Sequence, residues 1–83
     1  MEEKSILQYL HEFGWAYSSP CGCRARMDKY VHESEKYKNH EIWVNKDGSF
    51  FEIRMKHDRT STKITSGIAS TLLNTFSNHF DSL

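Results

Sequence analysis

Apolar residues near the start of the chain recur with the period of a helix. Within residues 2–13 they are spaced by three and four positions, at Ile6, Tyr9, Leu10 and Phe13. This spacing places them on one side of an amphipathic helix. Gly14 follows at once and predicts the helix end, because glycine readily takes the left-handed backbone found there.

The next part of the chain alternates as strands do. Residues 15–18 predict a short strand, and residues 24–32 alternate strictly enough to predict a half-buried one. In this second strand we expect one face to carry Ala25, Met27 and Val31 toward the core. The opposite, outward face then carries Arg24, Arg26, Asp28, Tyr30 and His32. Residues 33–39 are charged and predict a loop.

Residues 40–57 predict a β-hairpin, because Asp47-Gly48 is a strong turn signal between two alternating runs. If Lys46 pairs with Ser49, then Val44 faces Phe51 and Ile42 faces Ile53, which gives an apolar inner face. On the outer face the same register sets Trp43 opposite Glu52 and Glu41 opposite Arg54. The match of opposite charges in the last pair supports this register independently.

The end of the chain predicts a long helix that reaches about Phe80. Residues 58–62 offer several N-cap candidates, and apolar residues then recur every four positions at Ile64, Ile68, Leu72, Phe76 and Phe80. The span 64–80 contains no Asp, Glu, Lys or Arg, although 27% of the chain is charged. Its polar side is small and uncharged, which is typical either of a solvated surface or of a face buried against a partner. For the partner alternative the contact residues are Ser66, Ser70 and Asn74.

These elements predict a single α+β domain over residues 1–83, with the order α-β-β-β-α. The two amphipathic helices both need apolar surface, and the simplest arrangement packs them on one face of an antiparallel sheet. A chain of 83 residues buries a thin core, so a partner can complete it. We therefore expect a protein partner or a homo-oligomer.

The outer face of the predicted sheet is unusual because large aromatic residues and arginines interleave on it. One interpretation is a protein interface, whose candidate residues are Trp43, Phe50 and Arg54, since these types are enriched at such contacts. The alternative is a nucleic-acid-binding face that uses Arg24, Arg26, Tyr30, Trp43, Arg54 and Lys56. A third interpretation is cross-strand packing with no ligand at all.

Charge and composition narrow the function classes further. The formal net charge is zero, which removes a bulk electrostatic attraction to nucleic acid or to an anionic membrane. No apolar run is long enough to span a membrane, and the N-terminus lacks a signal-peptide pattern, so we expect a cytoplasmic protein without membrane contact. Nucleic acid remains possible through a local basic patch.

Two cysteines, Cys21 and Cys23, are the only weak candidates for a metal site. They are separated by one residue, whereas zinc sites usually separate paired cysteines by two to four and need four ligands. No phosphate-binding loop, catalytic carboxylate pair or nucleophile–base pattern is present. The sequence therefore predicts no enzyme, no metal and no cofactor.

Together these patterns predict a non-enzymatic protein-binding or assembly module. A phage or mobile-element structural or accessory protein is one setting for such a module, in the cytoplasm or in a particle assembled there.

Overall fold

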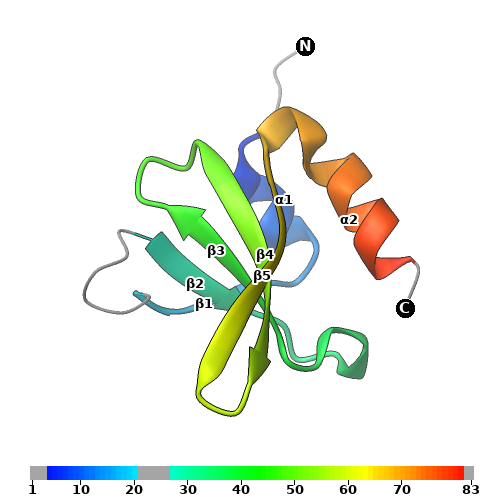
Figure 1. Cartoon of the computed structure of the whole chain (residues 1–83). Coiled ribbons are helices and arrows are strands. Elements are labelled where there is room, and N and C mark those ends of the chain that lie inside the picture. The colour runs from blue at the N-terminus through cyan, green and yellow to red at the C-terminus, as the bar shows by residue number, and fades with distance from the viewer. Residues whose placement is uncertain (1–3, 21–26, 82–83) are drawn as a thin grey trace.

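The computed structural model describes residues 4–20 and 27–81, apart from the side chains of Ser19 and Pro20 (Figure 1). Its elements in chain order are α1 (Ile6–Glu12), β1 (Ala16–Pro20), β2 (Met27–Val31), the 3-10 turn η1 (Glu35–Tyr37), β3 (His40–Asn45), β4 (Phe50–His57), β5 (Thr60–Ile68), the 3-10 turn η2 (Ala69–Thr71) and α2 (Leu72–Phe80). Among the described residues, no helix is long and apolar enough to cross a membrane.

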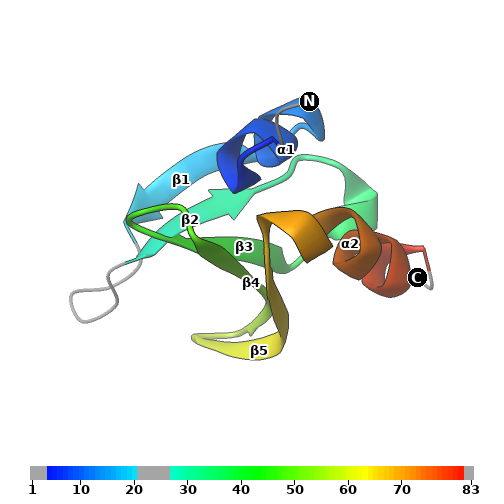
Figure 2. The same cartoon turned by 90° about the horizontal axis from the view of Figure 1, so that it is seen from above.

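The five strands form one antiparallel sheet in the order β1-β2-β3-β4-β5. Each strand therefore pairs with its neighbour in the sequence. The sheet curves, and both helices lie on the same side of it (Figure 2). The predicted α+β class, with both helices packed on one face, is confirmed.

The core lies between the two helices and the inner face of the central strands. Ile6 and Leu10 of α1 are fully buried, at the helical spacing predicted for them. One continuous cluster joins them to alternate residues of β3 and β4 and to α2, and its other members are Trp15, Ile42, Val44, Phe51, Ile53, Leu72, Phe76 and Phe80.

Helix α1 ends where the sequence predicted, and its end sets the position of a core tryptophan. Gly14 has a φ of +88°, and its amide donates to the carbonyl of His11 at 3.2 Å. The amide of Trp15 donates to the carbonyl of Leu10 at 2.8 Å, which completes a Schellman motif. The change of chain direction at Gly14 places the side chain of Trp15 in the core, where Trp15 is 4% exposed.

The hairpin of β3 and β4 has the predicted register. Val44 pairs with Phe51 and Ile42 with Ile53 on the inner face, and all four side chains are buried. Trp43 pairs with Glu52 and Glu41 with Arg54 on the outer face. In the turn, Gly48 has a φ of +74° and its amide donates to the carbonyl of Asn45 at 2.9 Å.

The prediction of one long final helix is wrong in its first half. Residues from Thr60 to Ile68 form β5, which pairs along its length with β4, and α2 begins only at Leu72. The sheet consequently has five strands, where the sequence predicted fewer. Residues 60–68 are rich in threonine and isoleucine, whose branched Cβ favours strands over helices. A four-residue spacing also fits a strand, because every fourth residue of a strand lies on one face.

The facing predicted for β2 is also wrong. Tyr30 pairs with Ile42, a buried inner-face residue, so Tyr30 lies on the helix side and packs against the core. Met27 and Val31, expected inside, lie on the opposite face, where Val31 is 37% exposed. A tyrosine ring supplies more apolar area than valine and keeps its hydroxyl at the edge of the core, so it takes the inner position.

Candidate functional site

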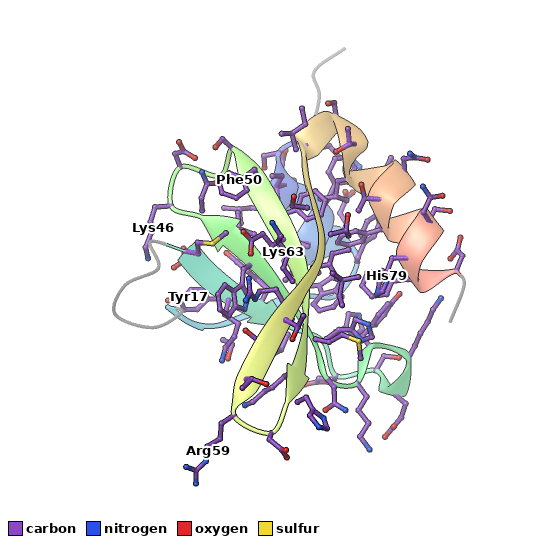
Figure 3. All side chains as sticks on the ribbon, in the orientation of Figure 1. Tyr17, Lys46, Phe50, Arg59, Lys63 and His79 are labelled. Atoms are coloured by element: carbon purple, nitrogen blue, oxygen red, sulfur yellow. The ribbon has the colours of Figure 1, made fainter. Side chains whose placement is uncertain are left out.

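The outer face of the sheet, which points away from both helices, changes in character along the strands. One end, here called the uncharged end, carries Met27, Asn45, Phe50 and Ile68. The opposite end, here called the cationic end, carries Lys56, Arg59 and Lys63. Phe50, Lys63 and Arg59 follow one another along β4 and β5 in Figure 3. Between the two ends lies a network of paired charges.

Arg54 is the centre of that network, and its guanidinium is held on three sides. It donates from Nη1 to Oε1 of Glu52 at 2.7 Å, from Nε to Oγ of Ser61 at 3.1 Å and from Nη2 to the carbonyl of Ser61 at 3.0 Å. The guanidinium also covers the ring of Trp43, at 4.1 Å from the ring centroid. These contacts fix Arg54 to its own sheet.

Glu41 is a carboxylate with only 5% exposure, and two neighbours compensate its charge. Trp43 donates its indole N–H to Oε1 at 3.1 Å, and Nζ of Lys29 lies 3.6 Å from Oε2. A buried carboxylate is strongly destabilising without such partners. Trp43 and Arg54, both predicted as site residues, are therefore brought together, and each has a structural role.

The uncharged end exposes large apolar side chains on adjacent strands. Phe50 of β4 pairs with Ile68 of β5, and the two residues are 37% and 52% exposed. The amide of Phe50 donates to Oδ1 of Asn45 at 3.0 Å, and Nδ2 of Asn45 donates to Oγ of Ser49 at 2.7 Å. An exposed apolar pair beside uncharged polar groups has the composition of a protein-contact surface.

The three residues predicted as one face of the last helix lie on three different elements. Ser66 belongs to β5 and pairs with Glu52 on the outer face, beside the uncharged end. Ser70 belongs to η2 and Asn74 to α2. The expectation of a single helix face is therefore wrong, because residues 64–68 form a strand. All three side chains are exposed.

Of the residues predicted for nucleic acid, Lys56 lies on the cationic end and Tyr30 on the helix side. Arg24 and Arg26 lie outside the described residues, as do Cys21 and Cys23. Within residues 4–20 and 27–81, no group of three or more His, Cys, Asp or Glu side chains is placed to hold a metal ion.

Sequence reasoning missed a groove at the cationic end. It has a volume of about 280 Å³ and crosses from β2 to the β4–β5 turn, with the lining residues Lys29, Glu41, Trp43, Lys56, Arg59, Thr60 and Ser61. The groove depends on the tight turn at Asp58, whose φ is +56° and for which the sequence carries no distinct signal. Asp58 falls among the residues that the sequence assigned to a helix start.

A histidine pair that the sequence did not predict links α2 to the sheet. Nε2 of His40 lies 3.1 Å from Nε2 of His79, and Nδ1 of His40 lies 3.1 Å from the carbonyl of Lys38. His40 is buried, at 6% exposure. Burial lowers the pKa of His79, and the facing His40 lowers it further.

The helix side carries an aromatic groove of about 220 Å³ between the end of α1 and α2. Its lining residues are Phe13, Trp15, Tyr37, Leu73, Phe76, Ser77, Phe80 and Asp81. Phe13 and Leu73 are its exposed hydrophobic members, at 39% and 53%. This groove is a second apolar surface, separated from the uncharged end by the thickness of the sheet.

Comparison of the chain with models of protein families, with curated proteins and with solved structures finds no match.

Proposed function

We propose that this protein is a non-enzymatic protein-binding or assembly module that contacts its partner with the outer face of the sheet. The observation that carries the proposal is the exposed pair Phe50 and Ile68 on adjacent strands. Aromatic residues are enriched where protein interfaces are buried, and charged residues are depleted there. Among the described residues, the outer-face side chains at the uncharged end, Met27, Asn45, Phe50 and Ile68, have this composition.

The alternative, a nucleic-acid-binding face, has less support. A base that stacks on Trp43 needs an open ring face, and the guanidinium of Arg54 already covers one. Arg54 also donates from all three of its nitrogens to its own sheet. Phosphate contacts supply most of the affinity for nucleic acid, and strongly salt-dependent binders make about six to ten of them, whereas the cationic end offers three side chains.

The proposed setting follows from size and from the lack of catalytic patterns in the sequence. A small assembly module suits a structural or accessory role in a phage or mobile element, in the cytoplasm or in a particle assembled there.

The test compares two double variants that each remove exposed apolar side chains. Phe50→Ser with Ile68→Ser changes the uncharged end, and Leu7→Ser with Leu73→Ser is the matched control on the helices. Light scattering measures the mass of the protein in solution. Affinity capture from cells of the protein's source, with the stoichiometry of recovered protein measured, detects another partner.

We expect the wild-type protein to form an oligomer or a stoichiometric complex, which the outer-face variant loses and the helix variant keeps. A monomer that recovers no partner contradicts the proposal. Loss of the complex only in the helix variant contradicts it too, and would place the contact on the exposed faces of the two helices.

A further inference from the structure

The groove at the cationic end has an excess of positive charge that its own surroundings do not neutralise. Lys56 and Arg59 line it, and neither forms an ion pair with another residue in the described part of the chain. The one acid in the lining, Glu41, is buried and already compensated by Lys29. A ligand in this groove therefore meets net positive charge.

The groove also offers a neutral hydrogen-bond donor beside the cations. Oγ of Ser61 accepts from Nε of Arg54, which leaves the hydroxyl hydrogen of Ser61 to be donated elsewhere. Cations together with a hydroxyl donor suit a ligand that presents several acceptor oxygens, as carboxylates and phosphates do.

The groove continues into a second one, which extends it into an elongated site. The second groove has a volume of about 270 Å³ and shares Lys29, Glu41 and Lys56 with the first. Its further lining residues are Ser18, Val31, His32, Tyr37, Asn39 and His40. Such a mixture of apolar, aromatic and polar side chains suits an extended peptide better than a single small anion.

We infer that these two grooves bind an extended acidic segment of the protein partner, with carboxylates placed at Lys56 and Arg59. The inference rests on the proposed function, because it assigns the cationic end to the same partner that covers the uncharged end. Arg59 reaches past the tip of the β4–β5 hairpin (Figure 3), where it can meet the part of the segment that leaves the groove. Charge complementarity at such a rim speeds association and fixes the direction of the bound chain.

The experiment measures fluorescence anisotropy of three labelled probes of equal length. These are an oligoglutamate peptide, an oligoglutamine peptide and a single-stranded oligothymidylate. Each is titrated with the wild-type protein and with two double variants. Lys56→Gln with Arg59→Gln removes the groove cations. Lys4→Gln with Lys36→Gln removes the same charge from exposed positions paired with Glu12 and Asp81.

We expect oligoglutamate to bind and oligoglutamine not to bind. The groove variant should weaken oligoglutamate binding about tenfold, the effect of about 1.4 kcal/mol, while the control variant stays within about twofold. Binding should also weaken as salt is raised, since the groove is open to solvent.

Any of three results overturns the inference. The first is no oligoglutamate binding, and the second is an equal loss of binding in both variants. The third is tighter binding of oligothymidylate with the same dependence on Lys56 and Arg59, which would make the occupant a nucleic acid. The Phe50 and Ile68 variant tests the proposed function separately, because its readout is loss of the protein complex and not peptide binding. If that loss occurs while oligoglutamate fails to bind, the proposed function stands and the groove assignment falls.

Discussion

Gly67 occupies a position in β5 where a single added methyl group should destabilise the fold measurably. A Cβ at this position would lie 2.6 Å from Oγ1 of Thr71 and 3.1 Å from the ring of Phe51. Oγ1 of Thr71 cannot move away freely, because it accepts from the amide of Ile68 at 3.0 Å and donates to the carbonyl of Ile68 at 3.1 Å. Phe51 is fully buried, so a shift of its ring would disturb the packed core.

These contacts set the size of the effect of Gly67→Ala. Overpacking a filled site costs about 1–3 kcal/mol, and each displaced hydrogen bond adds about 1 kcal/mol. The reduced entropy of the unfolded chain returns about 0.4–1 kcal/mol. We expect a net loss of about 2 kcal/mol in the free energy of unfolding, or about 10 °C in Tm for a domain of this size.

The assay is guanidinium denaturation followed by far-UV circular dichroism, in a double-mutant cycle with Thr71→Ala. Removing the hydroxyl of Thr71 removes the shortest contact, so Gly67→Ala should cost only about 1 kcal/mol in that background. Gly48→Ala is the matched control. Nothing lies within 4 Å of its added Cβ, so it should cost about 1 kcal/mol from its left-handed φ alone, with or without Thr71. Additive effects of Gly67→Ala and Thr71→Ala would refute the reasoning.

Further predictions concern the outer-face network, the histidine pair and the first helix. Arg54→Met should lower the free energy of unfolding by about 2–3 kcal/mol in chemical denaturation, because it removes three hydrogen bonds and leaves the partly buried Glu52 unpaired. Arg59→Met should change the free energy of unfolding little. Equal losses of stability in the two variants would contradict the structural role given to Arg54. The folded-state pKa of His79 lies below its ordinary value of about 6.5, so the unfolded state binds the proton first as pH falls. Stability should therefore be full above about pH 6.5 and decline below it, and His79→Gln should reduce that decline. An unchanged pH profile in this variant would contradict the prediction. Ser5→Ala should cost about 1 kcal/mol, because it removes the acceptor for the amide of Gln8 in the capping box, and an unchanged denaturation midpoint would argue against that cap.

The hairpin of β3 and β4 could be predicted residue by residue because several independent signals agree on it. Asp47-Gly48 sets the turn, alternation sets the inner face, and the pair Glu41 and Arg54 confirms the register. A shift by one residue would move every buried side chain to the outer face. The hairpin was therefore predicted correctly because these signals all require the same register.

The start of the last helix could not be predicted, because one pattern fits two structures. Ile64 and Ile68 continue the four-residue spacing of Leu72 and Phe76 but lie in β5, where both are exposed. Ile64 has no partner in β4, because the register shifts there by one residue. A bulge of this kind depends on tertiary packing and leaves no periodic signal in the sequence.

The candidate site was predictable where it depends on adjacent strands and unpredictable where it depends on turns. Trp43, Phe50 and Arg54 were placed on the outer face by the hairpin register alone. The groove at the cationic end could not be predicted, because it depends on the β4–β5 turn at Asp58. The sequence of that turn fits a helix N-cap equally well. The covering of Trp43 by Arg54 depends on side-chain rotamers, which no alternation pattern specifies.

The order of the sheet has a consequence for how the chain folds. Every strand pairs with its neighbour in sequence, so each pairing closes a short stretch of chain, and such local topologies fold fast. Closing the core requires a much longer loop, because α1 and α2 lie at opposite ends of the described chain. The two helices meet where the ring centroids of Phe13 and Phe76 lie 5.9 Å apart. We therefore expect the sheet to form before the helices meet. Substitutions at the contact of Phe13 and Phe76 would then speed unfolding more than they slow folding.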